Sequence, residues 1–117
     1  MNTRKIVINS AHGGFGLTDK AIRLFLTKKK ISFIESSRQN SLFSREFTFF
    51  VNGKYFSEYD IKRDDPVLIE VLEELGLEQC EDSFCSLKIV EIPIDVEWQI
   101  CEYDGSEWVA EKHRTWE

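Results

Sequence analysis

A tight-turn signature, Asn52-Gly53, constrains the fold of this chain more than any other feature of the sequence. Both central residues of a two-residue hairpin turn need positive φ, which Asn and Gly tolerate. The turn lies between two runs that are rich in aromatic and β-branched residues, 47–51 and 54–56. The sequence therefore predicts an antiparallel β-hairpin here.

Two helices are predicted on either side of this hairpin. Thr18 is placed to cap a helix that runs to about Lys30, and Asp65 with Pro66 begins a second helix that Gly76 ends. The other expected elements are strands at 5–9, 87–92, 96–100 and from Trp108, the last two joined by a turn at Asp104-Gly105. An extended piece is expected at 31–34, and loops are expected at 36–44 and 77–86.

The length and composition favour a single folded domain spanning residues 1–117. Hydrophobic residues make up 42% of the chain and aromatic residues 13%, which is enough for a core without staples. The expected class is α+β, with two helices packed on one face of a mainly antiparallel sheet. The first strand is expected to be internal, because its central residues, 6–8, are all β-branched and apolar.

The apolar runs and cysteines predict a protein of the host cell cytoplasm with no membrane partner. No run approaches the roughly 18 apolar residues of a spanning helix, and the N-terminal residues lack the apolar region of a signal peptide. Three cysteines form an odd set, so free thiols are expected. Cys80, Cys85, Cys101 and His113 lack the compact spacing of a zinc site, so we expect no metal and no cofactor.

Charge is divided unevenly along the chain. Residues 1–63 hold 12 basic and 5 acidic side chains, whereas residues 64–117 hold 3 basic and 16 acidic ones. The net charge of −6 argues against binding to duplex nucleic acid, whose affinity comes from Lys and Arg. A local basic pocket remains compatible with this total, as does simple packing of the two halves against each other.

A glycine-rich loop between the first strand and the first helix is the first candidate site. It contains His12, Gly13, Gly14, Phe15 and Gly16. Glycines let a backbone approach a ligand closely, and a helix start offers N–H groups to an anion such as phosphate. The third glycine of a dinucleotide fingerprint is missing. The alternative is a structural turn in which Phe15 plugs the core.

Cationic side chains supply two further candidates. Lys112, His113 and Arg114 precede Trp116 near the end of the chain, where they could bind phosphate while the indole stacks on a base. The alternative is a solvated terminus with a core-capping tryptophan. Arg63 could reach a neighbouring pocket or pair with an aspartate.

The only histidines, His12 and His113, could share general acid and base work if the fold brings them together. They are the catalytic residues expected if the protein is an enzyme. The cysteines have no neighbouring motif that marks a nucleophile. A binding protein is therefore favoured over an enzyme.

Several segments carry a family signal: KIVIN (5–9) with HGGFGL (12–17), R-x-DP (63–66), V-x-EELG (71–76), LKIVEIP (87–93) and EYDG-x-EWVAEKHRTW (102–116). Together they resemble a family of small uncharacterised proteins of phages and prophages. The resemblance implies an accessory or counter-defence role, and proteins that capture nucleotide immune signals are one such class. It implies no catalytic residues.

These observations lead to one expected function and two alternatives. The first is a non-enzymatic pocket for a small anionic, nucleotide-like ligand. The glycine loop, Arg63, Lys112 and Arg114 would contact the phosphate, and Phe15 or Trp116 would stack on the base. The second is an acidic module, residues 77–111, that inhibits a host protein. The third is a small nucleotide hydrolase that uses His12 or His113. The sequence leaves oligomer formation open.

Overall fold

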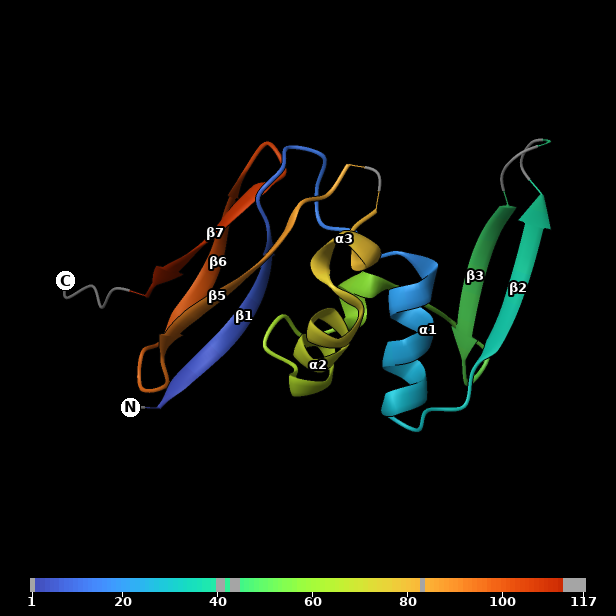
Figure 1. The fold of residues 1–117 in the computed structure, drawn as a ribbon, viewed down its shortest axis with the longest axis horizontal. Helices are drawn as coiled ribbons and strands as arrows, with labels where there is room; N and C mark the ends of the chain where they lie inside the picture. Colours follow the sequence, from blue (N-terminus) through green and yellow to red (C-terminus); the bar gives the residue numbers. More distant parts are fainter. Residues whose placement is uncertain (1, 40–41, 43–44, 83, 113–117) are drawn as a thin grey trace.

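The computed structural model describes residues 2–39, 42, 45–82 and 84–112 of the chain. They form a body of 55 × 31 × 30 Å (Figure 1). In chain order its elements are β1 (Thr3–Asn9), α1 (Asp19–Lys28), β2 (Ile34–Gln39), β3 (Arg45–Val51), β4 (Lys54–Phe56), a short 3-10 helix (Glu58–Asp60), α2 (Pro66–Leu75), α3 (Leu77–Cys80), β5 (Leu87–Pro93), β6 (Trp98–Tyr103) and β7 (Ser106–Glu111).

The α+β class expected from the sequence is confirmed, but the strands do not form one sheet. Three antiparallel sheets are present among the described residues, with strand orders β1-β5, β2-β3-β4 and β6-β7. The expected arrangement of two helices on one face of one sheet is therefore corrected. The helices lie between the β1–β5 pair and the β2–β3–β4 sheet, and the β6–β7 hairpin packs against the β1–β5 pair (Figure 1).

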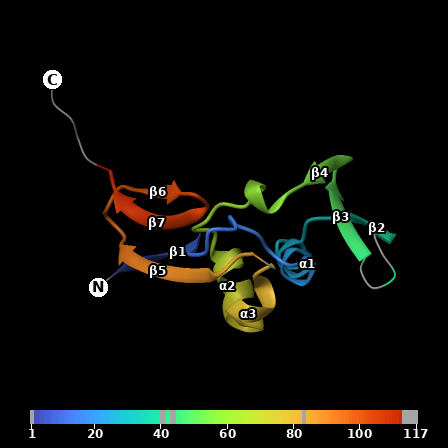
Figure 2. The same ribbon diagram turned by 90° about the horizontal axis from the view of Figure 1, so that it is seen from above.

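The β6–β7 hairpin, the β1–β5 pair and the helices α2 and α3 lie in successive layers (Figure 2). β1 is covered on both faces, which explains why Ile6, Val7 and Ile8 are all buried. The expectation that this strand is internal needs one correction. β1 pairs with β5 along one edge only, and on its other edge the Val7 amide donates to the carbonyl of Arg63 at 2.8 Å.

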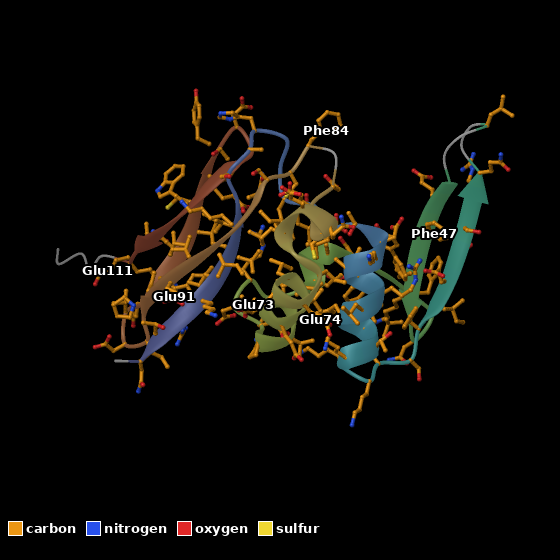
Figure 3. The ribbon with its side chains drawn as sticks, in the orientation of Figure 1. Phe47, Glu73, Glu74, Phe84, Glu91 and Glu111 are labelled. Carbon is orange, nitrogen blue, oxygen red and sulfur yellow. The ribbon has the colours of Figure 1, made fainter. Side chains whose placement is uncertain are left out.

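The helix α1 lies between α2 and the β2–β3–β4 sheet. Phe25 of α1 stacks on Phe56 of β4, with ring centroids 6.4 Å apart. The guanidinium of Arg23 lies 5.5 Å from the ring centroid of Phe47, which points from β3 toward the helix (Figure 3). These contacts attach the β2–β3–β4 sheet to the core.

The local signals in the sequence act as predicted. Asn52 and Gly53 adopt φ of 52° and 77°, and Asp104 and Gly105 adopt φ of 51° and 88°. The Thr18 hydroxyl accepts from the Ala21 amide at the start of α1. No helix in the described part of the chain is long and apolar enough to span a membrane.

One expected loop is a strand. Residues 34–39 form β2, which pairs along its length with β3 although its six side chains are all exposed. The segment is polar and has no apolar alternation, so its strand conformation comes from the neighbouring β3 backbone.

Candidate functional site

The glycine loop approaches other parts of its own chain. A Cβ at Gly13 would overlap the backbone of Phe84, and one at Gly16 would overlap the carboxylate of Asp82. At the tip of the β6–β7 hairpin, Gly105 has φ of +88°, and a Cβ there would overlap the carbonyl of His12. The close approach that glycine permits is thus used to bring three segments of this protein together.

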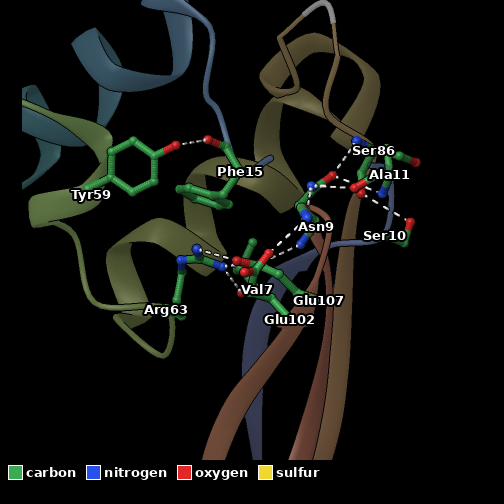
Figure 4. A network of polar contacts seen from close by, with 11 residues as sticks. Val7, Asn9, Ser10, Ala11, Phe15, Tyr59, Arg63, Ser86, Glu102 and Glu107 are labelled. Atoms are coloured by element: carbon green, nitrogen blue, oxygen red, sulfur yellow. Dashed lines mark hydrogen bonds and ion pairs between the residues drawn. The ribbon is translucent and has the colours of Figure 1, made fainter. Parts of the chain in front are cut away.

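Asn9, at the end of β1, holds these three segments by hydrogen bonds (Figure 4). Its side-chain nitrogen, Nδ2, donates to the carbonyls of Ala11 at 2.8 Å and Gly105 at 2.9 Å. Its side-chain oxygen accepts from the backbone N–H groups of Ala11 and Ser86. Asn9 is fully buried, and within the described ranges no buried side-chain nitrogen or oxygen lacks a partner. This network stabilises the loop without a ligand.

Arg63 and Phe15, two of the predicted site residues, do lie together, but both have partners within the protein. The guanidinium of Arg63 lies 3.6 Å from the centroid of the buried Phe15 ring. It also donates two hydrogen bonds to the carboxylate of Glu107, at 2.7 and 2.9 Å (Figure 4). The side chains of Arg63 and Glu107 are 15% and 10% exposed. A ligand phosphate would have to displace Glu107 to reach Arg63.

The contacts of Glu107 stabilise the ionised form of its carboxyl group. Burial alone would raise the pKa of its carboxyl group. The hydrogen bonds from Arg63 and from the backbone N–H of Asn9, together with the positive charge of Arg63, outweigh burial and hold the pKa below its ordinary value. Arg63 is ion-paired, but with a glutamate 44 residues away and not with the aspartate that the sequence interpretation named.

The start of α1 borders a hollow of about 580 Å³ that is strongly acidic. Burial raises the pKa of the Asp19 carboxyl group, the neighbouring Arg23 lowers it, and the charges of Glu35 and Glu46 raise it further. This acidic hollow is lined by Leu17, Thr18, Asp19, Glu78, Glu81, Asp82 and Cys85. Four carboxylates and no cationic side chain line it, so an anion at this helix start meets like charge.

The remaining predicted residues are placed as follows. His12 is exposed, and its Nδ1 lies 3.2 Å from the carbonyl oxygen of Asp104. Lys112 is exposed, and its amide donates to the carbonyl of Glu97. His113, Arg114 and Trp116 lie outside the described residues, so both the tail site and the pairing of His12 with His113 remain predictions. Gly14 adopts φ of +89°, and a Cβ there would meet open space.

The thiols show no sign of a metal site in the described part of the chain. Cys80 and Cys85 are buried, Cys101 is half-buried, and all three are free. No group of three or more His, Cys, Asp or Glu side chains among the described residues could hold a metal ion. Burial raises the pKa of the Cys80 and Cys85 thiols, which makes both of them poor nucleophiles.

A second hollow of about 580 Å³ lies where the first residues of β1 meet the start of α2. It combines cationic and apolar side chains, and it is lined by Thr3, Arg4, Lys5, Lys62, Asp64, Asp65, Pro66, Ile69 and Ile94. This cationic hollow also includes Ile94, which directly follows β5, because β1 pairs with β5 in a register that places Thr3 opposite Pro93. Its size falls within the range of about 300–1,000 Å³ for small-molecule sites.

The carboxylates of the cationic hollow are largely neutralised. Asp65 pairs with Lys29 at 2.7 Å and, as the cap of α2, accepts a hydrogen bond from the Val67 amide. Its carboxylate is therefore paired with groups that do not line the hollow. Asp64 forms a long ion pair of 3.8 Å with Arg4. Lys5 pairs with Glu73 of α2 at 3.3 Å. Lys62 has no ion-pair partner within the described ranges, so it supplies the surplus positive charge of the hollow.

The sequence analysis missed this hollow. Its cations, Arg4, Lys5 and Lys62, were not among the site residues predicted from the sequence. A signal was present, since Lys62 stands three residues before the Asp65 helix cap, and Arg4 and Lys5 stand directly before the apolar run 6–8. Nothing in the sequence showed that these two segments lie side by side. No family model, curated protein or solved structure matches this chain.

Proposed function

We propose that this protein binds a small anionic, nucleotide-like ligand in the cationic hollow and does so without turnover. The observation that carries the proposal is the contrast between two hollows of equal size. The acidic hollow presents four carboxylates, whereas the cationic hollow presents Arg4, Lys5 and Lys62 in a protein whose net charge is −6. An anion is therefore attracted more strongly to the cationic hollow than to the acidic hollow.

Each wall of the cationic hollow suits one part of such a ligand. Arg4 and Lys62 would contact phosphate oxygens, the arginine as a planar fork and the lysine as a point charge. Pro66, Ile69 and Ile94 form an apolar surface on which a base can lie. The long Arg4–Asp64 pair, at 3.8 Å, is weak enough for a phosphate to replace.

The resemblance to phage proteins supports one biological role for this binding. A counter-defence protein that sequesters a host signalling nucleotide needs a pocket for a phosphate and a base, and it needs no catalytic group. The acidic remainder of the surface would repel long nucleic acid, so the pocket would select short ligands.

Thermal unfolding against a ligand panel tests the proposal. The panel contains phosphate, pyrophosphate, AMP, ADP, cyclic nucleotides and ADP-ribose. A ligand present at 100 times its dissociation constant adds about 2.7 kcal/mol to the unfolding free energy, which is roughly 10 °C for a domain of this size. ADP should stabilise the protein more than pyrophosphate, because only ADP reaches the apolar wall.

Matched variants locate the site. Lys62→Gln should weaken binding roughly 10-fold, since it removes a charged contact to phosphate. Lys54→Gln, at an exposed position of β4, should leave binding unchanged. The proposal fails if no panel member raises the unfolding temperature. It also fails if the two variants respond alike.

A further inference from the structure

The outward face of the β6–β7 hairpin carries exposed aromatic side chains. The register places Trp108 opposite Cys101 and Tyr103 opposite Ser106, so these four residues share one face. Glu107, on the other face, binds Arg63 of the protein interior. Tyr103 is 74% exposed and Trp108 is 48% exposed, and the register makes them diagonal neighbours across the two strands. The two aromatic rings are thus open to solvent, whereas Ser106, at the hairpin tip, donates to the carbonyl of Ser10 at 3.1 Å.

The adjoining edge of β6 is open. β6 pairs with β7 along one side, and no other strand among the described residues pairs with it. In the view from above, β6 lies at the outer side of the layered body (Figure 2). An edge strand presents alternating unpaired N–H and C=O groups, which can accept a further strand.

Carboxylates mark this edge at both of its ends. Asp95 and Glu97 precede β6, and Glu102 and Asp104 lie at its far end; all four are exposed. None has a cationic side chain within ion-pair distance in the part of the chain that the structure describes. From Glu97 to Lys112 the hairpin holds five acidic residues and one basic residue. A second copy pairing antiparallel through β6 would bring acidic ends together, so the charges oppose self-association.

We propose that the β6 edge binds an extended, cationic segment of a partner protein as an additional strand. Backbone hydrogen bonds to β6 would supply affinity, and alternate side chains would supply specificity. Arginine or lysine side chains on the outward face would lie over the Tyr103 ring and reach Trp108, while the ends of the segment pair with the four carboxylates. The same carboxylates repel nucleic acid.

The probe is an eight-residue peptide of alternating arginine and valine, added to isotope-labelled full-length protein. Amide shifts should concentrate in β6, and the Trp108 indole N–H should move with them. A peptide of the same sequence with every second amide N-methylated keeps its charge but cannot pair along one edge. It should bind at least roughly 10-fold more weakly.

Variants separate the aromatic and electrostatic contributions. Tyr103→Ser should weaken binding several-fold, whereas Tyr55→Ser, at a position 64% exposed on β4, should not. The pair Glu102→Gln with Asp104→Asn preserves the local turn, including the acceptor for the Gly105 amide, and should weaken binding roughly 5- to 20-fold.

Three results would overturn the proposal: equal affinity of the N-methylated peptide, shifts spread over the acidic hollow rather than β6, or a wild-type dimer that dissociates on mutation of β6. None of them bears on ligand binding in the cationic hollow.

Discussion

Replacing Glu107 with alanine should destabilise this fold more than any exposed substitution. Its carboxylate accepts two hydrogen bonds from Arg63 and one, at 2.8 Å, from the amide of Asn9. Both side chains of the ion pair are at least 85% buried, so solvent screens the interaction little. Glu107→Ala leaves a buried guanidinium and a buried N–H without their partner.

Removing one member of a buried pair costs about 3–5 kcal/mol. A domain of this length has roughly 6–17 kcal/mol of unfolding free energy in total, so the loss is a large share. Glu107→Gln keeps an acceptor for the Asn9 amide and loses the charge, and should cost about 2 kcal/mol. The double variant Arg63→Met with Glu107→Leu leaves no unpaired charge. Its cost should be near that of the Asn9 N–H alone, about 1–3 kcal/mol.

Urea denaturation of the wild type, the Glu107→Ala and Glu107→Gln variants, the double variant and its two component single variants, Arg63→Met and Glu107→Leu, measures these differences. The double variant should lose less stability than the sum of its two component variants, which is a departure from additivity, and it should be more stable than Glu107→Ala. If Glu107→Ala costs less than about 1 kcal/mol, or if the two substitutions simply add, the ion pair does not hold the β6–β7 hairpin to the body.

Three further predictions concern acidity, backbone and thiols. Because the folded pKa of Glu107 is lowered, the stability that its charge contributes is fully present above the ordinary value of 4.5 and is lost as pH falls through the folded pKa. In urea denaturation, the difference in unfolding free energy between the wild type and Glu107→Gln should therefore shrink below about pH 4.5. A difference that stays constant with pH would refute this. Gly105→Ala should lower the unfolding free energy by roughly 3 kcal/mol and Gly53→Ala by roughly 1 kcal/mol, as measured by thermal unfolding. Both glycines have positive φ, but only at Gly105 would a Cβ overlap another backbone segment. Equal losses of unfolding free energy would contradict this. Cys80 and Cys85 should react with a thiol reagent far more slowly in the native protein than in denaturant, and fast native labelling of both would show that they are accessible.

Local features of the fold could be predicted from the sequence because they depend on neighbouring residues. The Asn52-Gly53 turn requires positive φ at adjacent positions, and the Asp65-Pro66 helix start requires a cap and a missing N–H. Both are confirmed. The strand β2 could not be predicted, because only pairing with β3 makes that polar segment extended.

The candidate site depends on contacts between distant segments, which the sequence does not reveal. The glycine loop was singled out for its residue types, yet its neighbours prove to be Phe84, Asp82 and the hairpin turn at Gly105. Arg63 was read as a ligand for phosphate or a partner for aspartate, and its partner Glu107 is a strand residue far along the chain. The cationic hollow needs the β1–β5 register, which brings Ile94 to Arg4.

A map of backbone amide shifts on addition of ADP tests the central claim most directly, because it distinguishes the two hollows in one titration. Binding in the cationic hollow should move the amides of Thr3, Arg4, Lys5 and Ile69, together with Lys62, in a saturable manner that Lys62→Gln weakens. The amides of Thr18 and Asp82 in the acidic hollow should stay in place. Saturable shifts confined to the glycine loop and the start of α1, or no saturable shifts at all, would contradict the proposed site.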